Sequence, residues 1–178
     1  MADLRDGGAR VIPTLGEVLE EFPDTRFFID PKHEPAVGPL GELLGRLSAK
    51  SLGRLSVAAF STSRTRAVVA EMHKHASGER QVSIGMGIGD LAGLAIRATV
   101  TPNKLWTPNY QTVQTPANIT TSRLVRAAHA GGARVYPWVI NSRADMEKFA
   151  ELGVDGQMTD LPSQLAEVYR AHLASQAA

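Results

Sequence analysis

Short β-like runs alternate with helix-like runs along this chain, and that alternation sets the narrowest limit on its fold. It is the pattern of βαβ units, in which successive strands lie parallel and helices cover the sheet. We therefore predict an α/β fold with about six strands, each followed by a helix. The expected strands span residues 26–30, 55–60, 81–86, 111–114, 134–140 and 154–159. The expected helices span residues 14–22, 36–51, 61–75, 88–98, 122–130, 143–152 and 162–173.

Local signals mark where several of these elements begin and end. Thr14 with Glu17 three residues later is the spacing of a capping box, which starts a helix. Pro31 ends the first strand, because proline cannot donate to a sheet ladder. Ser61 or Ser63 can cap the helix that follows the second strand. Residues 99–120 are the least regular stretch, and we expect a long loop there around one short strand.

Composition excludes several classes of function. The chain has no cysteine, which rules out disulfides, thiolate metal sites and cysteine nucleophiles. Its formal net charge of +1 predicts no general attraction to nucleic acid or to anionic membranes. No apolar run approaches the roughly 20 residues of a membrane-spanning helix, and residues 1–10 lack the apolar core of a signal peptide. These features favour a cytoplasmic protein, and any anion that it binds would have to be held by a local site.

Four segments, in order, resemble the glycerophosphodiester phosphodiesterase family. IPTLGEVL at residues 12–19 resembles the family's IPTLEEVL helix start, and FIDPK at residues 28–32 lies where the family has a strand ending Ile-Glu-Ile-Lys. The helix over residues 124–129 and VYPWVIN at residues 135–141 resemble its penultimate helix and strand. GVDG and TDLP within residues 153–162 resemble its last strand. Each segment alone is weak, but four in the right order cover nearly the whole chain, least well over residues 85–115.

The resemblance implies a (β/α)8 TIM barrel with its site at the carboxyl ends of the strands. The segments here would be strands three to eight, so residues 1–178 would form a single domain of this family that is incomplete at its N-terminus, truncated to about six β/α units. Residues 1–13 resemble the linker that follows the second strand. The family's first two strands carry a His-Arg-Gly motif, an acidic pair of metal ligands and a later His-Asp, and residues 1–25 match none of them.

The resemblance also implies roles for three residues here, and a fourth candidate follows from its place at a strand end. Asp30 falls where the family has a glutamate that binds a divalent cation, Mg2+ or Ca2+, although aspartate is one methylene shorter. Lys32 falls on the lysine that contacts the substrate phosphate, and Trp138 on a tryptophan that packs beside the alcohol part. Phe60 ends the second strand, where it would either line the rim of the site or pack in the core.

Histidines decide whether acid–base chemistry is available, because hydrolysis in the family uses two of them. His33 is the weak catalytic candidate here, since it adjoins the expected site. His73 and His75 are two residues apart on an expected helix and point to different faces. The remaining two histidines, His129 and His172, match no catalytic position of the family. The expected metal pair and both acid–base histidines are therefore absent, and we predict an impaired site.

Three hypotheses remain open. The first is a metal-binding hydrolase of lipid metabolism that converts a glycerophosphodiester and water into sn-glycerol 3-phosphate and an alcohol. The second is a non-catalytic remnant or interaction module on a partial barrel, which would self-associate through its exposed edges. The third is another phosphate-binding barrel, such as a sugar-phosphate isomerase, but the acidic residue and proline within residues 159–162 are poor phosphate ligands.

Overall fold

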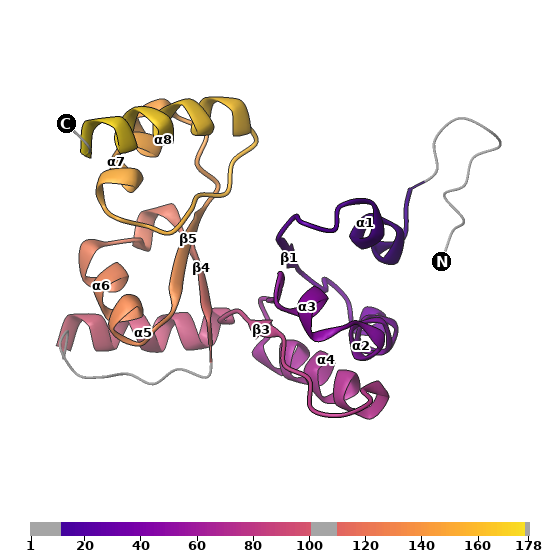
Figure 1. Ribbon diagram of the computed structural model, residues 1–178. Helices are drawn as coiled ribbons and strands as arrows, with labels where there is room; N and C mark the ends of the chain where they lie inside the picture. The colour runs from indigo at the N-terminus through magenta and orange to yellow at the C-terminus, as the bar shows by residue number, and fades with distance from the viewer. Residues whose placement is uncertain (1–11, 101–109, 177–178) are drawn as a thin grey trace.

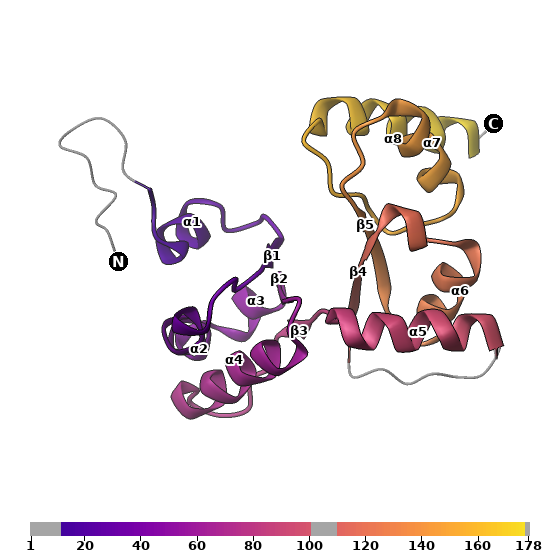
Figure 2. The same ribbon diagram turned by 180° about the vertical axis from the view of Figure 1, so that it is seen from behind.

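A computed structural model describes residues 12–100 and 110–176 of the chain (Figure 1). The expected linker over residues 1–13 lies almost wholly outside the described residues, as do residues 101–109 of the expected loop. The described residues form parallel strands that alternate with helices, as the sequence pattern predicts. Figures 1 and 2 show the helices from indigo to magenta grouped around one set of strands and those from orange to yellow around another.

The first set is a three-stranded parallel sheet in the order β1-β2-β3. In its register Phe27 lies opposite Leu55, and Ser56 lies opposite Ser83. The strands are β1 (Phe27–Ile29), β2 (Leu55–Val57) and β3 (Ser83–Ile84). The helices around them are α1 (Leu15–Glu21), the 3-10 turn η1 (Glu34–Ala36), α2 (Val37–Arg46), α3 (Ala49–Leu52) and α4 (Thr62–His75).

The second set is the parallel pair β4-β5, in which Gln114 lies opposite Tyr136. Its strands are β4 (Thr112–Pro116) and β5 (Arg134–Trp138). Its helices are α5 (Ile88–Val100), the 3-10 turn η2 (Ala117–Ile119), α6 (Ser122–Ala130), α7 (Arg143–Glu151) and α8 (Pro162–Gln176).

A parallel bridge between Gly85 and Thr112 joins the two sets. The Met86 amide donates to the Thr112 carbonyl at 3.0 Å, and the Gln111 amide donates to the Ile84 carbonyl at 3.0 Å. A side-chain hydrogen bond of 3.0 Å between Ser56 and Thr112 adds to this link. The strands therefore follow one another in a single row, with their carboxyl ends at the same edge.

The strand predicted over residues 154–159 is not a regular strand in the structure. This segment nevertheless runs beside β5, because the Asp155 amide donates to the Val135 carbonyl at 3.0 Å and the Met158 amide to the Pro137 carbonyl at 2.9 Å. Among the described residues it has no partner strand on its other side, as β1 has none beyond β2. Five regular strands and one extended run thus replace the six strands predicted.

The leucine stripe predicted as one helix over residues 36–51 is divided into η1, α2 and α3. The division falls at Leu47, whose backbone is extended (φ −73°, ψ 151°). Ser48 then caps α3, its side chain accepting from the Ser51 amide at 3.1 Å. A serine after an apolar helical run can thus begin a new helix, because its hydroxyl satisfies an amide of the next first turn.

Two apolar cores lie behind the strands. One packs Leu44, Leu52, Val57 and Met72 between the first sheet and its helices, all fully buried. The other lies between β4, β5 and the helices α5–α8, and its largest fully buried side chain is that of Phe149. Two members of the second core, Met86 and Leu91, lie near the strand ends.

Glycines allow α2 to approach α4 closely. A Cβ on Gly41 would lie 2.4 Å from the Glu71 Cβ, and one on Gly45 would lie 2.7 Å from the Met72 carbonyl oxygen. Neither position therefore accepts a side chain without moving a helix. Within residues 12–100 and 110–176, no helix is both long and apolar enough to cross a membrane.

Candidate ligand-binding pocket at the carboxyl ends of the strands

A cavity of about 360 Å³ opens where the strands end. Every strand and the extended run beside β5 contribute to its wall, so the pocket exists only because the carboxyl ends meet at one edge. The residues that line it are Asp30, Lys32, Ala58, Ala59, Phe60, Met86, Leu91, Gln114, Pro116, Trp138, Val139 and Met158. Its wall is largely apolar, with one carboxylate and one ammonium group among the lining residues described.

Asp30 and Lys32 follow β1 directly and form an ion pair across the intervening Pro31. The Lys32 Nζ donates to Asp30 Oδ2 at 2.5 Å, and the two side chains are 61% and 35% exposed. The ammonium group thus neutralises the carboxylate at the mouth of the pocket. Because both groups remain open to water, an anion that enters the pocket can share the lysine.

Two aromatic rings extend this charged pair across the pocket. The Lys32 Nζ lies 5.4 Å from the centre of the Phe60 ring, within the range of a cation–π contact. The Phe60 and Trp138 rings meet edge to face with their centres 6.0 Å apart. The ends of three different strands therefore contribute to one continuous row of side chains, which consists of Asp30, Lys32, Phe60 and Trp138. Phe60 is 54% exposed, so it lies at the rim rather than in the core.

The weak catalytic candidate His33 does not join this row. It precedes η1 as an exposed N-cap residue without a side-chain cap bond, and it is not among the lining residues. His129 instead bonds Asp155 at 2.8 Å, beside the beginning of β5. His73 and His75 lie in the last turn of α4. No histidine of the described residues lines the pocket.

Gln114 and Met158 are two of the lining residues that the sequence analysis did not predict. Gln114 lies in the middle of β4, and its Nε2 is buried without a hydrogen-bond partner among the described residues. Strand alternation offers a signal for it, since a glutamine between Thr112 and Pro116 shares their face. Met158 has no such signal, because the segment around it is not a regular strand.

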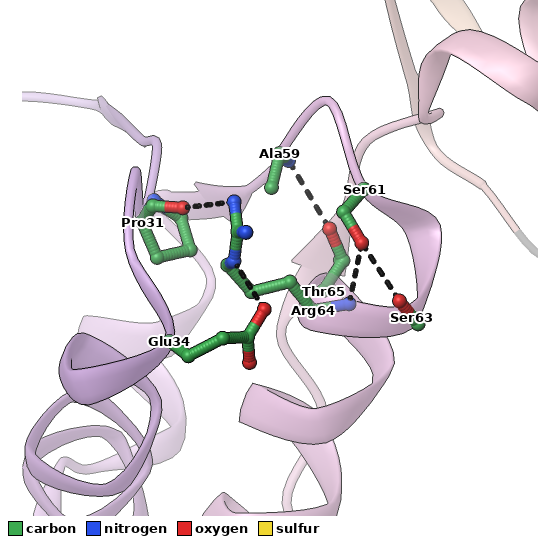
Figure 3. A network of polar contacts seen from close by, with 7 residues as sticks. All are labelled: Pro31, Glu34, Ala59, Ser61, Ser63, Arg64 and Thr65. Carbon is green, nitrogen blue, oxygen red and sulfur yellow. Dashed lines mark hydrogen bonds and ion pairs between the residues drawn. The ribbon is translucent and has the colours of Figure 1, made fainter.

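The first turn of α4 holds the two pocket segments in place (Figure 3). The Arg64 guanidinium donates to the Glu34 carboxylate at 2.8 Å and to the Pro31 carbonyl at 3.3 Å. The Thr65 hydroxyl accepts from the Ala59 amide at 3.1 Å. Ser61 is the N-cap of this helix, as predicted, and accepts from the Arg64 amide at 3.3 Å.

A second polar cluster lies beside the pocket, between α4 and α5. Asp90 accepts from the Tyr110 hydroxyl at 2.8 Å and from the Thr62 hydroxyl at 2.5 Å. Burial, and then the hydrogen bond to Asp90, raise the pKa of the Tyr110 hydroxyl above its ordinary value. Tyr110 therefore stays protonated as a donor at neutral pH, and the cluster ties the two halves of the structure together.

The lining residues do not make up a ligand set for a divalent cation. Ca2+ takes six to eight oxygen ligands, and Mg2+ takes six, of which several are usually waters and one or two are carboxylates. Asp30 is the one acidic residue among those lining the pocket, and its carboxylate is paired with Lys32. In the part of the chain that the structure describes, no three or more His, Asp or Glu side chains group in a way that could hold a metal ion.

Parallel strands covered by helices, with a pocket at their carboxyl ends, define an α/β protein, and this arrangement is the one found in TIM barrels. The chain belongs to the glycerophosphoryl diester phosphodiesterase family, whose sequence profile matches residues 2–164. A curated protein of Mycobacterium tuberculosis, "Probable glycerophosphodiester phosphodiesterase 2", is 29% identical over 170 residues. That match covers 91% of this chain and 61% of the relative, so the chain spans about three fifths of the relative's length.

Solved structures agree on the fold. A crystal structure of a glycerophosphodiester phosphodiesterase from Parabacteroides distasonis superposes with a TM-score of 0.58 at 14% identity, covering 91% of this chain and 63% of that one. A structure from Silicibacter pomeroyi also gives 0.58 at 21% identity, covering 88% and 55%. The family resemblance and the α/β class predicted from the sequence are thereby confirmed.

Proposed function

We propose that this chain carries the phosphate- and alcohol-binding side of a glycerophosphodiester hydrolase. The reaction would consume water and yield sn-glycerol 3-phosphate and an alcohol. The observation that carries the proposal is the continuous row of Asp30, Lys32, Phe60 and Trp138 around one cavity. Family membership supports the substrate class.

Each member of the row has a role that its chemistry suits. The Lys32 ammonium is a compact charge on a flexible stem, and it would turn from Asp30 toward a phosphoryl oxygen. Asp30 holds that ammonium at the mouth of the pocket until a ligand arrives. The ring of Trp138, with Phe60 against its edge, offers an apolar wall for the carbon atoms of the diester.

Among the lining residues described, no histidine or unpaired carboxylate is present to move a proton. Hydrolysis needs one group to activate water and another to protonate the leaving alkoxide, each worth typically about 10²–10⁴-fold in rate. None of the lining residues described is a histidine, and the one carboxylate is held by Lys32. We therefore propose that the isolated chain binds phosphate-bearing ligands but hydrolyses diesters very weakly or not at all.

The proposed site is also incomplete as a cation site. Asp30 would be the one carboxylate that this pocket offers to Mg2+ or Ca2+, and further ligands would have to come from elsewhere. We also propose that the chain forms a partial barrel of about six β/α units, which are equivalent to units three to eight of the family.

Titration of the purified chain with sn-glycerol 3-phosphate, followed by NMR or calorimetry, tests the binding role. We expect Lys32→Ala to weaken binding about tenfold or more, since a charge-assisted contact is lost. Lys50→Ala is the matched control, because Lys50 is an exposed lysine on α3, away from the lining residues. Equal affinities for the two variants would refute the phosphate role of Lys32.

Hydrolysis of glycerophosphocholine, with and without Mg2+ or Ca2+, tests the proposed impairment. We expect no metal-dependent turnover. Turnover that Asp30→Ala abolished would mean that this chain holds a working site, and the impairment would be wrong.

We also propose that the chain self-associates through its free strand edges. Among the described residues, β1 and the run beside β5 each pair on one side alone. Phe28 on β1 is 42% exposed although it touches Tyr136, their ring centres 4.8 Å apart. Unpaired edges with exposed aromatic residues favour association. Sedimentation across a concentration series should show a dimer or larger species, and a strictly monomeric chain would refute the proposal.

A further inference from the structure

The segment that carries Asp30 and Lys32 lies beyond the sheet, so something other than strand pairing must hold it. Its centre is Pro31, which is buried and whose carbonyl oxygen faces α4. The Arg64 Nη1 donates to that carbonyl at 3.3 Å, across 33 residues of sequence. The Arg64 guanidinium is thus hydrogen-bonded to the backbone between the two charged residues of the pocket.

The same guanidinium reaches the far end of the segment. Arg64 Nε donates to Glu34 Oε1 at 2.8 Å, in the first turn of η1 (Figure 3). The Arg64 side chain is 20% exposed and that of Glu34 is 68% exposed. An ion pair so open to water contributes little stability by itself. Its value is geometric, because two acceptors fix the plane of the guanidinium.

Arg64 is in turn fixed to the other arm of the pocket. It stands in the first turn of α4, whose N-cap Ser61 follows Phe60 directly. In the next position, Thr65 holds the Ala59 amide. A single helical turn therefore bonds both the segment after β1 and the segment after β2.

We propose that Arg64 is a positioning residue that sets the place of the Asp30–Lys32 pair relative to Phe60. Arg64 does not line the pocket and would not touch a ligand. By holding the ammonium beside the ring before a ligand arrives, it lowers the cost of ordering the site on binding. Its consequence for affinity rests on the proposed function, while its effect on geometry does not.

The first measurement is of geometry and needs no ligand. The Phe60 ring, 5.4 Å from the Lys32 Nζ, shifts the NMR signals of the lysine side chain. We expect Arg64→Ala to move those signals toward random-coil values. Arg46→Ala is the matched control, since Arg46 is an exposed arginine on α2 that pairs with Glu42. Its spectrum should match the wild type at Lys32.

The second measurement is affinity for sn-glycerol 3-phosphate. We expect Arg64→Ala to weaken binding about five- to tenfold through lost preorganisation, with Arg64→Lys intermediate because an ammonium cannot reproduce the planar fork. Thermal melts identify any variant that fails to fold, and Glu34→Ala, which keeps the bond to Pro31, then serves as the milder variant. It should leave most of the Lys32 shift in place.

Unchanged Lys32 signals in folded Arg64→Ala would overturn the inference. The proposed function fails separately, if the wild type shows no affinity for the phosphate ligand while the Lys32 signals still depend on Arg64.

Discussion

Thr65→Val isolates one buried hydrogen bond that shapes the pocket. Thr65 is 1% exposed, and its Oγ1 accepts from the amide of Ala59, which is 5% exposed and lines the cavity. Valine matches threonine in shape but cannot accept a hydrogen bond. The substitution therefore leaves a buried backbone N–H without its partner and opens little space.

The structure permits a magnitude for this loss. A buried donor left unsatisfied costs about 1–3 kcal/mol. Thr65→Ser is the matched control, because it keeps the hydroxyl and removes one methyl group. A small deletion of that kind costs about 0.5–1.5 kcal/mol, by analogy with Ile→Val. We expect the valine variant to be the less stable of the two.

Urea unfolding followed by circular dichroism measures the difference. With a slope of about 2 kcal/mol per M, the valine variant should unfold at a urea concentration lower by roughly 0.5–1.5 M. Hydrogen exchange at Ala59 should accelerate in Thr65→Val and stay slow in Thr65→Ser. If valine proved as stable as serine, with Ala59 still protected, the bond would not hold the pocket segment and the reasoning would be refuted.

Four further substitutions test other parts of the structure. Leu44→Ala should cost about 2–5 kcal/mol in urea unfolding, because Leu44 is fully buried in the first core; a loss below 1 kcal/mol would contradict that packing. Gly153→Ala should cost about 1–2 kcal/mol, since its φ of +79° is a left-handed conformation, although a Cβ there meets nothing within 4 Å. Gly38→Ala, on α2 with equal space for a Cβ, should instead be neutral or stabilising. Hydrogen bonds from Lys74 and His75 on α4 lower the pKa of Glu71 below its ordinary 4.5. The charged carboxylate therefore stabilises the fold above pH 4.5, and this contribution is lost as the pH falls through the lowered pKa. Glu71→Gln should therefore differ most from the wild type in thermal melts near neutral pH and converge with it in acid.

Local sequence signals predicted most elements because their causes are local. Thr14 and Glu17 form the expected capping box, with the Thr14 amide donating to Glu17 at 2.7 Å. α4 and α6 begin and end close to their predicted bounds, since their caps and apolar spacing lie within a few residues. The division at Leu47 was not predicted, because the leucines keep helical spacing up to that residue. The break lies in the backbone of Leu47, which is extended and not helical.

The row around the pocket depended on two kinds of information. Asp30, Lys32 and Trp138 were selected by resemblance to a family, residue by residue, and their functional roles stay predictions. The sequence left Phe60 between the rim and the core, and its 54% exposure favours the rim. His33 was adjacent in sequence, yet its side chain does not reach the cavity wall.

By itself, the sequence determined an α/β chain of parallel strands and helices, because alternation and caps act over a few residues. It also determined the family, through four short segments in order. Only the tertiary structure decided that Lys32 pairs with Asp30, that the Phe60 ring contacts the Trp138 ring, and that Arg64 donates a hydrogen bond to the Pro31 carbonyl. The last two contacts join residues 78 and 33 positions apart by their numbering, and the path of the chain over those distances depends on how strands and helices pack together.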